Sequence, residues 1–257
     1  MSNPPLRVER EDGFAVLTLC RPERRNPLSV ETLEALLAAL GEIAEGDARG
    51  VILAAEGPVF CAGHDYRDLA AQGLDGTHAL LTLCRRVMNA IQAQPQPVIA
   101  EVRGLATAGG CQLVASCDLA VAGESARFAV PGGAGGWFCT TPGVALVRAI
   151  GRKRALEMLL TGDPIEARTA LDWGLVNRVV EDAAVPAETR ALLARATRGS
   201  ARSKAIGKRA FHRQVDLDTK GAYDWATEVM AAASQSPDAR EGVQAFLEKR
   251  RPEWNEG

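Results

Sequence analysis

Residues 104–118 read G-L-A-T-A-G-G-C-Q-L-V-A-S-C-D, and this stretch decides the fold that we expect. Gly109 and Gly110 stand where an apolar strand-like run gives way to an apolar helix. A Gly-Gly pair at a helix start leaves backbone N–H groups unpaired and unshielded by any Cβ, so a ligand oxygen can approach them closely. The stretch therefore predicts a turn and helix whose first N–H groups can bind such an oxygen.

A second turn of the same kind occurs at residues 60–65, F-C-A-G-H-D, where an apolar strand ends at Gly63. Glycine there allows the chain to turn sharply. Either segment alone is also typical of an ordinary junction between a strand and a helix. Together they supply two sets of backbone N–H donors, as an oxyanion hole for a thioester carbonyl requires.

With these two turns, four further segments carry a family resemblance. They are P-V-I-A-E-V-R-G at 97–104, C-D-L-A-V-A at 117–122, T-G-D-P-I-E-A-R-T-A-L-D-W-G-L-V-N-R-V-V at 161–180 and F-L-E-K-R-R-P at 246–252. Over nearly its whole length the chain resembles the crotonase superfamily, also called the enoyl-CoA hydratase/isomerase family. Within this family, A-T-A-G-G-C-Q-L-V-A-S-C-D at 106–118 and W-F-C-T-T-P-G-V-A-L at 137–146 look most like the subgroup called enoyl-CoA hydratase domain-containing protein 3.

The resemblance implies an α/β crotonase (ClpP/crotonase-like) fold of repeated ββα units. We expect this core over residues 1–195, followed by a helical region over residues 196–257 that mediates trimer formation. A homotrimer or a hexamer built as a dimer of trimers is the expected assembly.

The apolar pattern itself predicts parallel strands and amphipathic helices. Nearly continuous apolar runs are typical of strands covered on both faces. Helices are expected where apolar residues recur every three to four positions, as Leu33, Leu36, Leu37 and Leu40 do after the capping residue Ser29. The expected strands are 14–20, 51–54, 98–102, 119–122 and 176–179, and the other expected helices are 77–94, 188–198, 203–213 and 240–250.

Composition narrows the function classes. A net charge of -2 gives no reason to expect a nucleic-acid partner, and no apolar run is long enough to span a membrane. The six cysteines have no C-x-x-C spacing, so reduced buried thiols are favoured over disulfides or zinc. The first residues carry neither a secretory apolar segment nor an acid-free transit pattern, so we expect a cytoplasmic protein. No cluster of metal-ligating residues is visible in the sequence, so we expect no metal site.

By resemblance, the two oxyanion donors are the backbone N–H groups of His64 and Gly109. The His64 side chain is a separate candidate, because an imidazole there could donate a proton, contact a substrate carboxylate or only fill space. Coenzyme A, as part of an acyl-CoA thioester substrate, is the only cofactor that we expect. Substrate contacts are expected from Ala62, Asp65, Tyr66, Gly110, Gly132, Trp137 and Phe138, and coenzyme A contacts from Arg24, Arg25 and Lys249.

The usual catalytic acids are missing from this pattern. Hydratases of the family use two glutamates, and those positions hold Gln112 and Gly132 here. A glutamine amide orients a water molecule but does not accept its proton, and glycine offers no side chain. The expected protein is an enoyl-CoA hydratase/isomerase-like enzyme with weak ordinary hydration. Acyl-CoA decarboxylation and acyl-CoA binding without turnover stay open as alternatives.

Two further residues, Cys139 and Asp118, have side chains that can take part in catalysis. Cys139 is expected to be a packing thiol, or a nucleophile if a base lies nearby. Asp118, at the start of a strand, is expected to be structural.

Restoring the two missing glutamates, as Gln112→Glu with Gly132→Glu, should raise the rate of hydration provided that the loop at 132 accepts a side chain.

Overall fold

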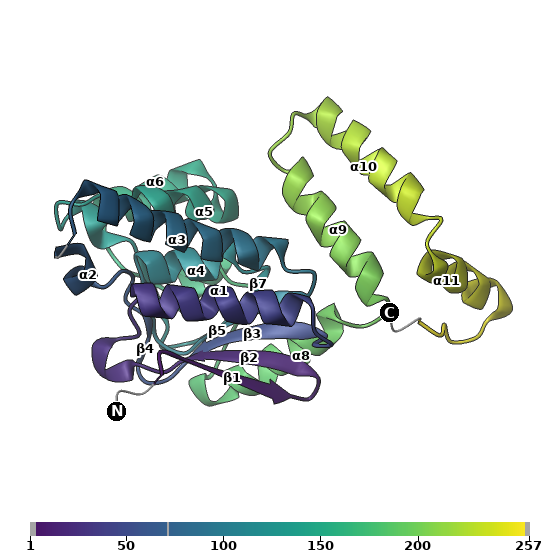
Figure 1. Cartoon of the computed structure of the whole chain (residues 1–257), viewed down its shortest axis with the longest axis horizontal. Coiled ribbons are helices and arrows are strands. Elements are labelled where there is room, and N and C mark those ends of the chain that lie inside the picture. The colour runs from purple at the N-terminus through teal and green to yellow at the C-terminus, as the bar shows by residue number, and fades with distance from the viewer. Residues whose placement is uncertain (1–3, 71, 255–257) are drawn as a thin grey trace.

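The computed structural model describes residues 4–70 and 72–254, in which two strands followed by a helix recur four times (Figure 1). This order confirms the expected α/β fold of repeated ββα units, with the short helix α2 (Tyr66–Ala70) inserted into the second unit. The four units are β1 (Leu6–Glu11), β2 (Phe14–Leu19) and α1 (Val30–Ala44); β3 (Gly50–Ala55), β4 (Val59–Cys61) and α3 (Leu74–Ala93); β5 (Val98–Val102), β6 (Leu105–Thr107) and α4 (Gly109–Ser116); β7 (Leu119–Gly123), β8 (Arg127–Ala129) and α5 (Thr140–Ile150).

The strands divide between two sheets. One has the order β1-β2-β3-β5-β7-β10, with β10 at Arg178–Val180, and only its β1–β2 pair is antiparallel. The other has the order β4-β6-β8-β9, with β9 at Ile165–Glu166. From the second unit to the fourth, the first strand joins the larger sheet and the second strand joins the smaller one. The smaller sheet therefore aligns the strand ends that lead to both predicted turns.

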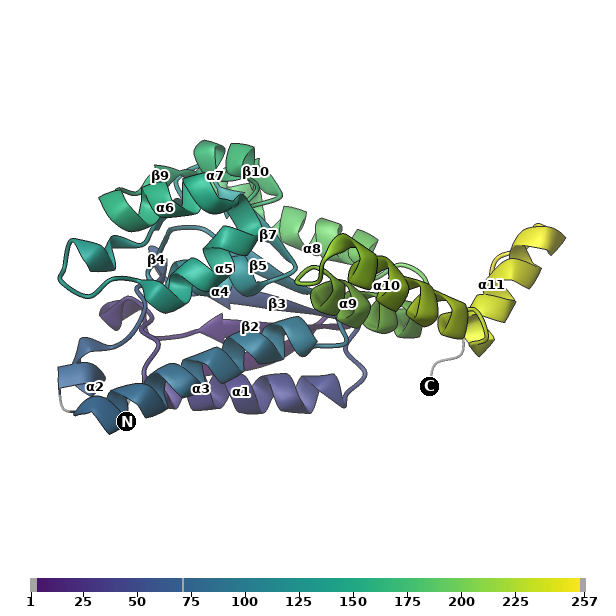
Figure 2. The same cartoon turned by 90° about the horizontal axis from the view of Figure 1, so that it is seen from above.

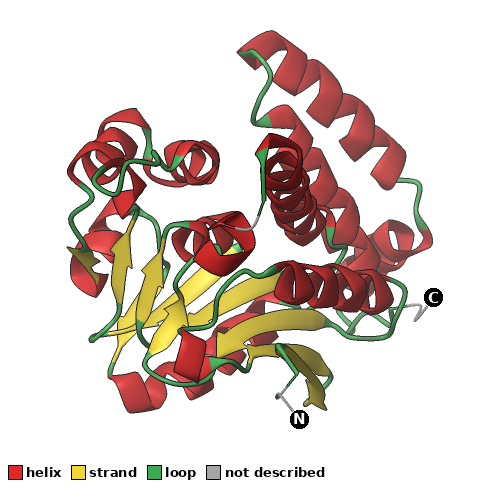
Figure 3. Cartoon of the chain, turned by 60° about the vertical axis from the view of Figure 1, so that its left-hand side comes forward, coloured by secondary structure: helices red, strands yellow, loops and turns green. Residues whose placement is uncertain are grey.

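Helices cover both faces of the larger sheet, as Figure 3 shows. On one face, Phe14, Val16 and Ile52 pack with Leu193 of α8 (Val185–Ala196). On the other, Leu17 and its neighbours join the main core formed with α1, α3 and α4. Alternate residues of β2, β3 and β7 thus enter opposite cores, which explains why these three strands are almost entirely apolar.

The C-terminal helices extend from one end of this α/β body, as both Figure 1 and Figure 2 show. Asp118 helps to hold them there, since its carboxylate accepts the Val98 N–H at 2.7 Å and lies 2.6 Å from Nζ of Lys208 on α9. Asp118 is therefore a structural residue. The C-terminal helices are α9 (Ala201–Gln214), α10 (Thr219–Ala233) and α11 (Pro237–Glu248); α6 (Arg152–Thr161), α7 (Ala167–Trp173) and the 3₁₀ turns Pro22–Arg24, Pro131–Gly133 and Asp182–Ala184 complete the body.

Two further features bear on the expectations from composition. Among the described helices, none has the length and apolar character needed to cross a membrane. All six cysteines are free thiols, and burial raises the pKa of both Cys61 and Cys111 to about 12. These two thiols therefore stay protonated at neutral pH. The division of the chain at residue 195 remains a proposal.

Several predicted boundaries are wrong by two or three residues. The strand expected at 176–179 begins only at Arg178, because the side chain of Asn177 accepts the Ala120 N–H at 2.8 Å in place of a strand partner. The helices expected from residues 203 and 240 begin at Ala201 and Pro237. The apolar pattern also misses β1, β8, β9, α2, α5, α6, α7 and α10 as separate elements.

Candidate functional site

The two predicted turns meet at the ends of neighbouring strands. β4 and β6 pair in parallel, so the turn at 62–65 and the turn at 108–109 leave the same edge of the smaller sheet. A Cβ placed on Gly63 would lie 3.0 Å from the Gly109 nitrogen, and one placed on Gly109 would lie 3.8 Å from the His64 nitrogen. Within the described part of the chain, neither N–H donates to a backbone carbonyl. Both predicted donors therefore lie close together and free.

The backbone at this junction is held in uncommon conformations. Gly63 has φ +85°, and Ala108, immediately before α4, has φ 50° and ψ −117°. A left-handed conformation at a residue with a Cβ costs about 1–3 kcal/mol and persists only where the surrounding structure enforces it. Gly110 packs directly on β4, since a Cβ there would lie 2.1 Å from the Cys61 carbonyl oxygen. The fold thus forces α4 to start with its first N–H groups beside the 62–65 turn.

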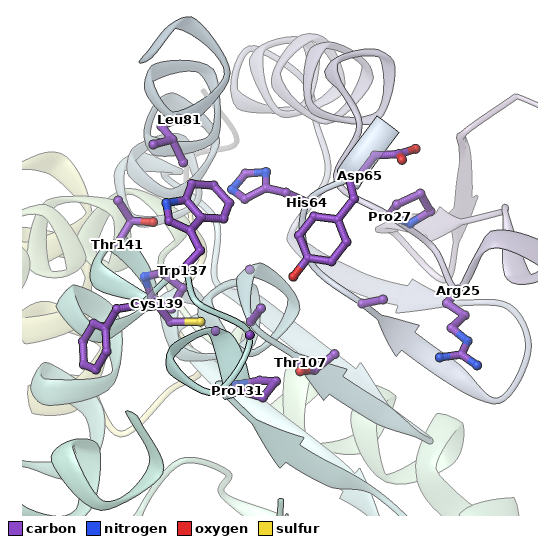
Figure 4. A pocket seen from close by; sticks show the side chains of 18 of the residues that line it. Arg25, Pro27, His64, Asp65, Leu81, Thr107, Pro131, Trp137, Cys139 and Thr141 are labelled. Carbon is purple, nitrogen blue, oxygen red and sulfur yellow. The ribbon is translucent and has the colours of Figure 1, made fainter. Parts of the chain in front are cut away.

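A cavity of about 910 Å³ opens in front of these N–H groups (Figure 4). Ten of the thirteen predicted site residues line it, while Gly110, Gln112 and Lys249 do not. Leu81 of α3 also lines the cavity, a contact that periodicity places on a helix but cannot assign to a site. The ten are Arg24, Arg25, Ala62, His64, Asp65, Tyr66, Gly109, Gly132, Trp137 and Phe138.

The cavity has two chemically different sides, as Figure 4 shows. His64, Trp137 and Leu81 lie together on one side, and Arg25 lies on the other. The charged side is organised by an ion pair between Arg24 and the buried carboxylate of Asp65. Asp65 also accepts the N–H of Arg67 at 3.0 Å. These contacts tie the 62–66 loop to the segment that carries Arg24.

The His64 imidazole faces the apolar side without a hydrogen-bond partner. Both ring nitrogens are shielded from solvent and make no hydrogen bond within the described chain. The ring centroid lies 6.5 Å from that of Trp137, with the planes tilted by 44°. Burial lowers the pKa of the imidazole from its ordinary value of 6.5 and outweighs the nearby Leu28 backbone and Asp68 carboxylate, which act to raise it, so the ring is neutral at neutral pH.

Gln112 lies inside the protein, one helical turn beyond Gly109. Its side chain is buried, and its Oε1 has no partner among the described residues. Residues three apart share one face of a helix, so Gln112 is on the face of α4 that begins with the Gly109 N–H. The cavity as it stands ends before this side chain.

Gly132 corrects the expectation that a glutamate could be restored at its position. A Cβ there would lie 2.2 Å from the Trp137 carbonyl oxygen and 2.6 Å from Sγ of Cys139. The turn is closed by the Trp137 N–H, which donates to the Gly132 carbonyl oxygen at 2.8 Å. Since backbone fills the space, Gly132→Glu would disrupt the loop, and the proposed double restoration is not a usable test.

Cys139 lines the cavity as a nearly buried thiol, and burial raises its pKa. A protonated thiol is a poor nucleophile. This argues for the packing role expected from the sequence.

Comparisons with known proteins identify the family of this chain. The family model described as enoyl-CoA hydratase/isomerase matches residues 9–257. The mouse protein "Enoyl-CoA hydratase domain-containing protein 3, mitochondrial" is 44% identical over 257 residues, which span 99% of this chain and 86% of that protein.

Two crystal structures are also similar. An enoyl-CoA hydratase of Mycobacterium smegmatis superposes with a TM-score of 0.94 at 49% identity, covering 98% of this chain and 99% of that one. Human enoyl-CoA hydratase domain-containing protein 3 superposes with a TM-score of 0.93 at 43% identity, covering 97% of this chain and 100% of that one. On this sequence and structural likeness, the chain belongs to the enoyl-CoA hydratase/isomerase family.

Proposed function

We propose that this protein binds an acyl-CoA thioester and stabilises an enolate-like oxyanion with the backbone N–H groups of His64 and Gly109. The observation that carries the proposal is the pair of free N–H groups beside a cavity of about 910 Å³. Two preorganised donors of this kind each contribute about 3–4 kcal/mol to a transition state that builds charge on the carbonyl oxygen. The related hydratases named above support acyl-CoA as the ligand class.

The acyl group would occupy the side of the cavity lined by Trp137 and Leu81, and coenzyme A the side that carries Arg24 and Arg25. Guanidinium groups suit phosphate because they donate paired hydrogen bonds. Lys249 does not line this cavity, so the cavity gives no support to its expected contact with coenzyme A. We expect binding to need no metal and no prosthetic group, so EDTA-treated protein should retain it in calorimetry.

Ordinary hydration is expected to be weak. The described residues that line the cavity include only two carboxylates, Glu23 and Asp65, and Asp65 is already paired with Arg24. A positioned acid or base typically contributes about 10²- to 10⁴-fold to a rate. The protein should therefore bind an enoyl-CoA thioester well but hydrate it slowly.

The test compares crotonyl-CoA, malonyl-CoA and butyryl-CoA by calorimetry and by turnover. We expect crotonyl-CoA to bind and to lose its enoyl absorbance slowly. Carbon dioxide release from malonyl-CoA would favour decarboxylation, which needs oxyanion stabilisation more than a base, and binding without any turnover would identify an acyl-CoA binder. Crotonyl-CoA hydration at about 10 s⁻¹ or faster would contradict the claim that hydratase machinery is missing.

We also propose that the protein assembles as a homotrimer or a dimer of trimers through the C-terminal helices. Large apolar side chains are exposed there, including Met230 at 79% and Phe246 at 82%. Closed symmetry would bury such surface. A monomer by light scattering at micromolar concentration would overturn this. The cytoplasmic location stays a prediction, since the mouse relative is named mitochondrial.

A further inference from the structure

The carboxylate of Asp68, in the short helix α2, caps a different helix. Its Oδ2 accepts the N–H of Val30, the first residue of α1, at 3.0 Å. The first N–H groups of a helix have no partner within that helix, and the helix dipole favours a negative charge beside them. Ser29 caps the same helix locally, since its side chain accepts the Thr32 N–H at 3.2 Å. Asp68 adds a second cap from outside and thereby ties α2 to α1.

This bond restrains the 62–65 turn from the side that follows His64. On the preceding side, the Leu28 N–H donates to the Gly63 carbonyl oxygen at 2.8 Å, and Leu28 forms an isolated parallel bridge with His64. On the following side, α2 begins two residues after His64 and is held by the Asp68 bond. The His64 peptide group is therefore fixed between two contacts with the segment that leads into α1.

The bond between Val30 and Asp68 lies outside the cavity, since neither residue lines it. A second side-chain restraint after His64 is the ion pair between Asp65 and Arg24, and both of those residues do line the cavity. A ligand phosphate would compete with Asp65 for the guanidinium group. The bond from Val30 to Asp68 is out of the ligand's reach and therefore persists when the cavity is filled.

The two groups that hold the turn also lie near the His64 ring. Burial lowers the pKa of the imidazole, whereas the Leu28 backbone and the Asp68 charge act to raise it. Charge effects of this kind weaken with distance and are screened by solvent. Asp68 is therefore close to the side chain of His64 as well as joined to α1.

We propose that Asp68 is a positioning residue whose bond to the Val30 N–H holds the backbone N–H of His64 in place for a thioester carbonyl oxygen. The inference rests on the proposed acyl-CoA binding. Asp68 touches no ligand and acts through the turn. Without its carboxylate, α2 loses this tie to α1, and the His64 N–H is free to turn away from the Gly109 N–H. A misplacement of about 1 Å is enough to weaken such a contact.

The experiment compares butyryl-CoA with S-butyl-CoA, a thioether in which a methylene replaces the carbonyl. The ratio of their dissociation constants, measured by calorimetry, reports the hydrogen bonds to the carbonyl oxygen and cancels the shared contacts of coenzyme A. We expect the wild-type protein to bind the thioester about 10-fold more tightly, as two hydrogen bonds predict. Asp68→Ala should reduce this preference at least about threefold. Asp68→Asn, which keeps a side-chain acceptor, should retain most of it.

Val30→Pro removes the donor of the same bond and keeps Asp68. Proline suits the first position of a helix, and Ser29 before it has the extended ψ of 164° that proline requires. We expect the same loss of preference as in Asp68→Ala, and no further loss in the double variant. Asp75→Ala is the matched control, because Asp75 is an exposed carboxylate in the first turn of α3 and lies outside the cavity. It should leave the ratio unchanged.

Each outcome decides the inference. A lower free energy of unfolding in Asp68→Ala, measured by urea denaturation, with an unchanged ratio would show a merely structural role and overturn it. Val30→Pro with the wild-type preference, or Asp68→Asn as impaired as Asp68→Ala, would also overturn it, since the bond to Val30 would not be the cause. If the wild-type protein binds neither compound, or binds both equally, the proposed function fails, and this inference fails with it.

Discussion

Helix α4 and the C-terminal helices α9 to α11 differ in how far their side chains are buried. In α4, seven of eight residues are buried, and its second glycine lies against a backbone carbonyl. In α9 and α10, no residue is buried. The conformation of α4 is therefore dictated within one chain. The C-terminal helices instead leave large apolar side chains such as Phe211, Met230 and Phe246 exposed.

The largest effect should follow from Gly110→Ala, which tests how strictly α4 is fixed. Its Cβ would lie 2.1 Å from the Cys61 carbonyl oxygen, so the helix or β4 must shift. We expect a loss of about 3 kcal/mol in the free energy of unfolding, measured by urea denaturation. Near-wild-type stability would mean that α4 is more adaptable than its burial indicates.

Charged substitutions on the C-terminal helices test whether their exposed apolar side chains form a subunit contact. Met230→Glu combined with Phe246→Glu should weaken the proposed assembly at least about 10-fold by placing carboxylates in a desolvated contact, with little change in helix content. Light scattering and circular dichroism would measure the two effects. Gln235→Glu, at an exposed polar position between α10 and α11, controls for added charge alone. Equal dissociation in the control would show that charge, not apolar contact, governs assembly.

Gln112→Glu tests whether a carboxyl group on α4 restores hydration. The new carboxyl would be buried, so desolvation should raise its pKa and favour the protonated, acidic form. We expect crotonyl-CoA hydration to rise by about 10²-fold, once folding and affinity are shown to be intact. The exposed Gln235→Glu again serves as the control. An unchanged rate would show that the side chain at 112 does not reach the substrate.

Lowering the pH should reduce folding stability because the His64 imidazole beside α4 is buried in its neutral form. Because burial lowers the pKa of folded His64 below 6.5, the unfolded chain takes up this proton first as the pH falls. Folding stability should therefore decrease below that ordinary value, down to the lowered pKa. His64→Leu should flatten this part of the stability curve, whereas His78→Leu should not. Parallel curves for wild type and His64→Leu would contradict a neutral buried ring.

The smallest effect is expected from Gly207→Ala on α9. Nothing lies within 4 Å of a Cβ placed there. Replacing an open helical glycine by alanine stabilises a protein by about 0.4–1 kcal/mol, measurable as a shift in thermal midpoint. A loss of stability instead would show that a neighbouring subunit packs closely on this face.

Sequence patterns predicted the long apolar strands well because covering on both faces leaves a continuous local signal. The predicted starts of α9 and α11 were late because the apolar pattern begins after the capping residues. Ser200 and Ser236 accept N–H groups of Ser203 and Ala239, respectively, and so start each helix earlier. The strands β4, β6 and β8, with three residues each, are too short to show a period.

At the site, the sequence identified both turns but not the contacts that decide their chemistry. That Gly132 excludes a side chain depends on the Trp137 carbonyl, which only the folded loop brings against it. The missing partners of His64 likewise follow from tertiary packing around the ring. Motifs therefore identified the proposed donors, and the three-dimensional structure defines which groups fit beside them.

The pairing of β4 with β6 has an evolutionary consequence. Both proposed donors are peptide N–H groups at the ends of neighbouring strands, so their position depends on sheet register and not on any reactive side chain. Among single substitutions, only proline removes a peptide N–H outright. A lineage can therefore exchange its acids and bases one at a time while keeping the capacity to polarise a carbonyl. New reactions can arise on such a scaffold without passing through a stage that has lost the old transition-state contact.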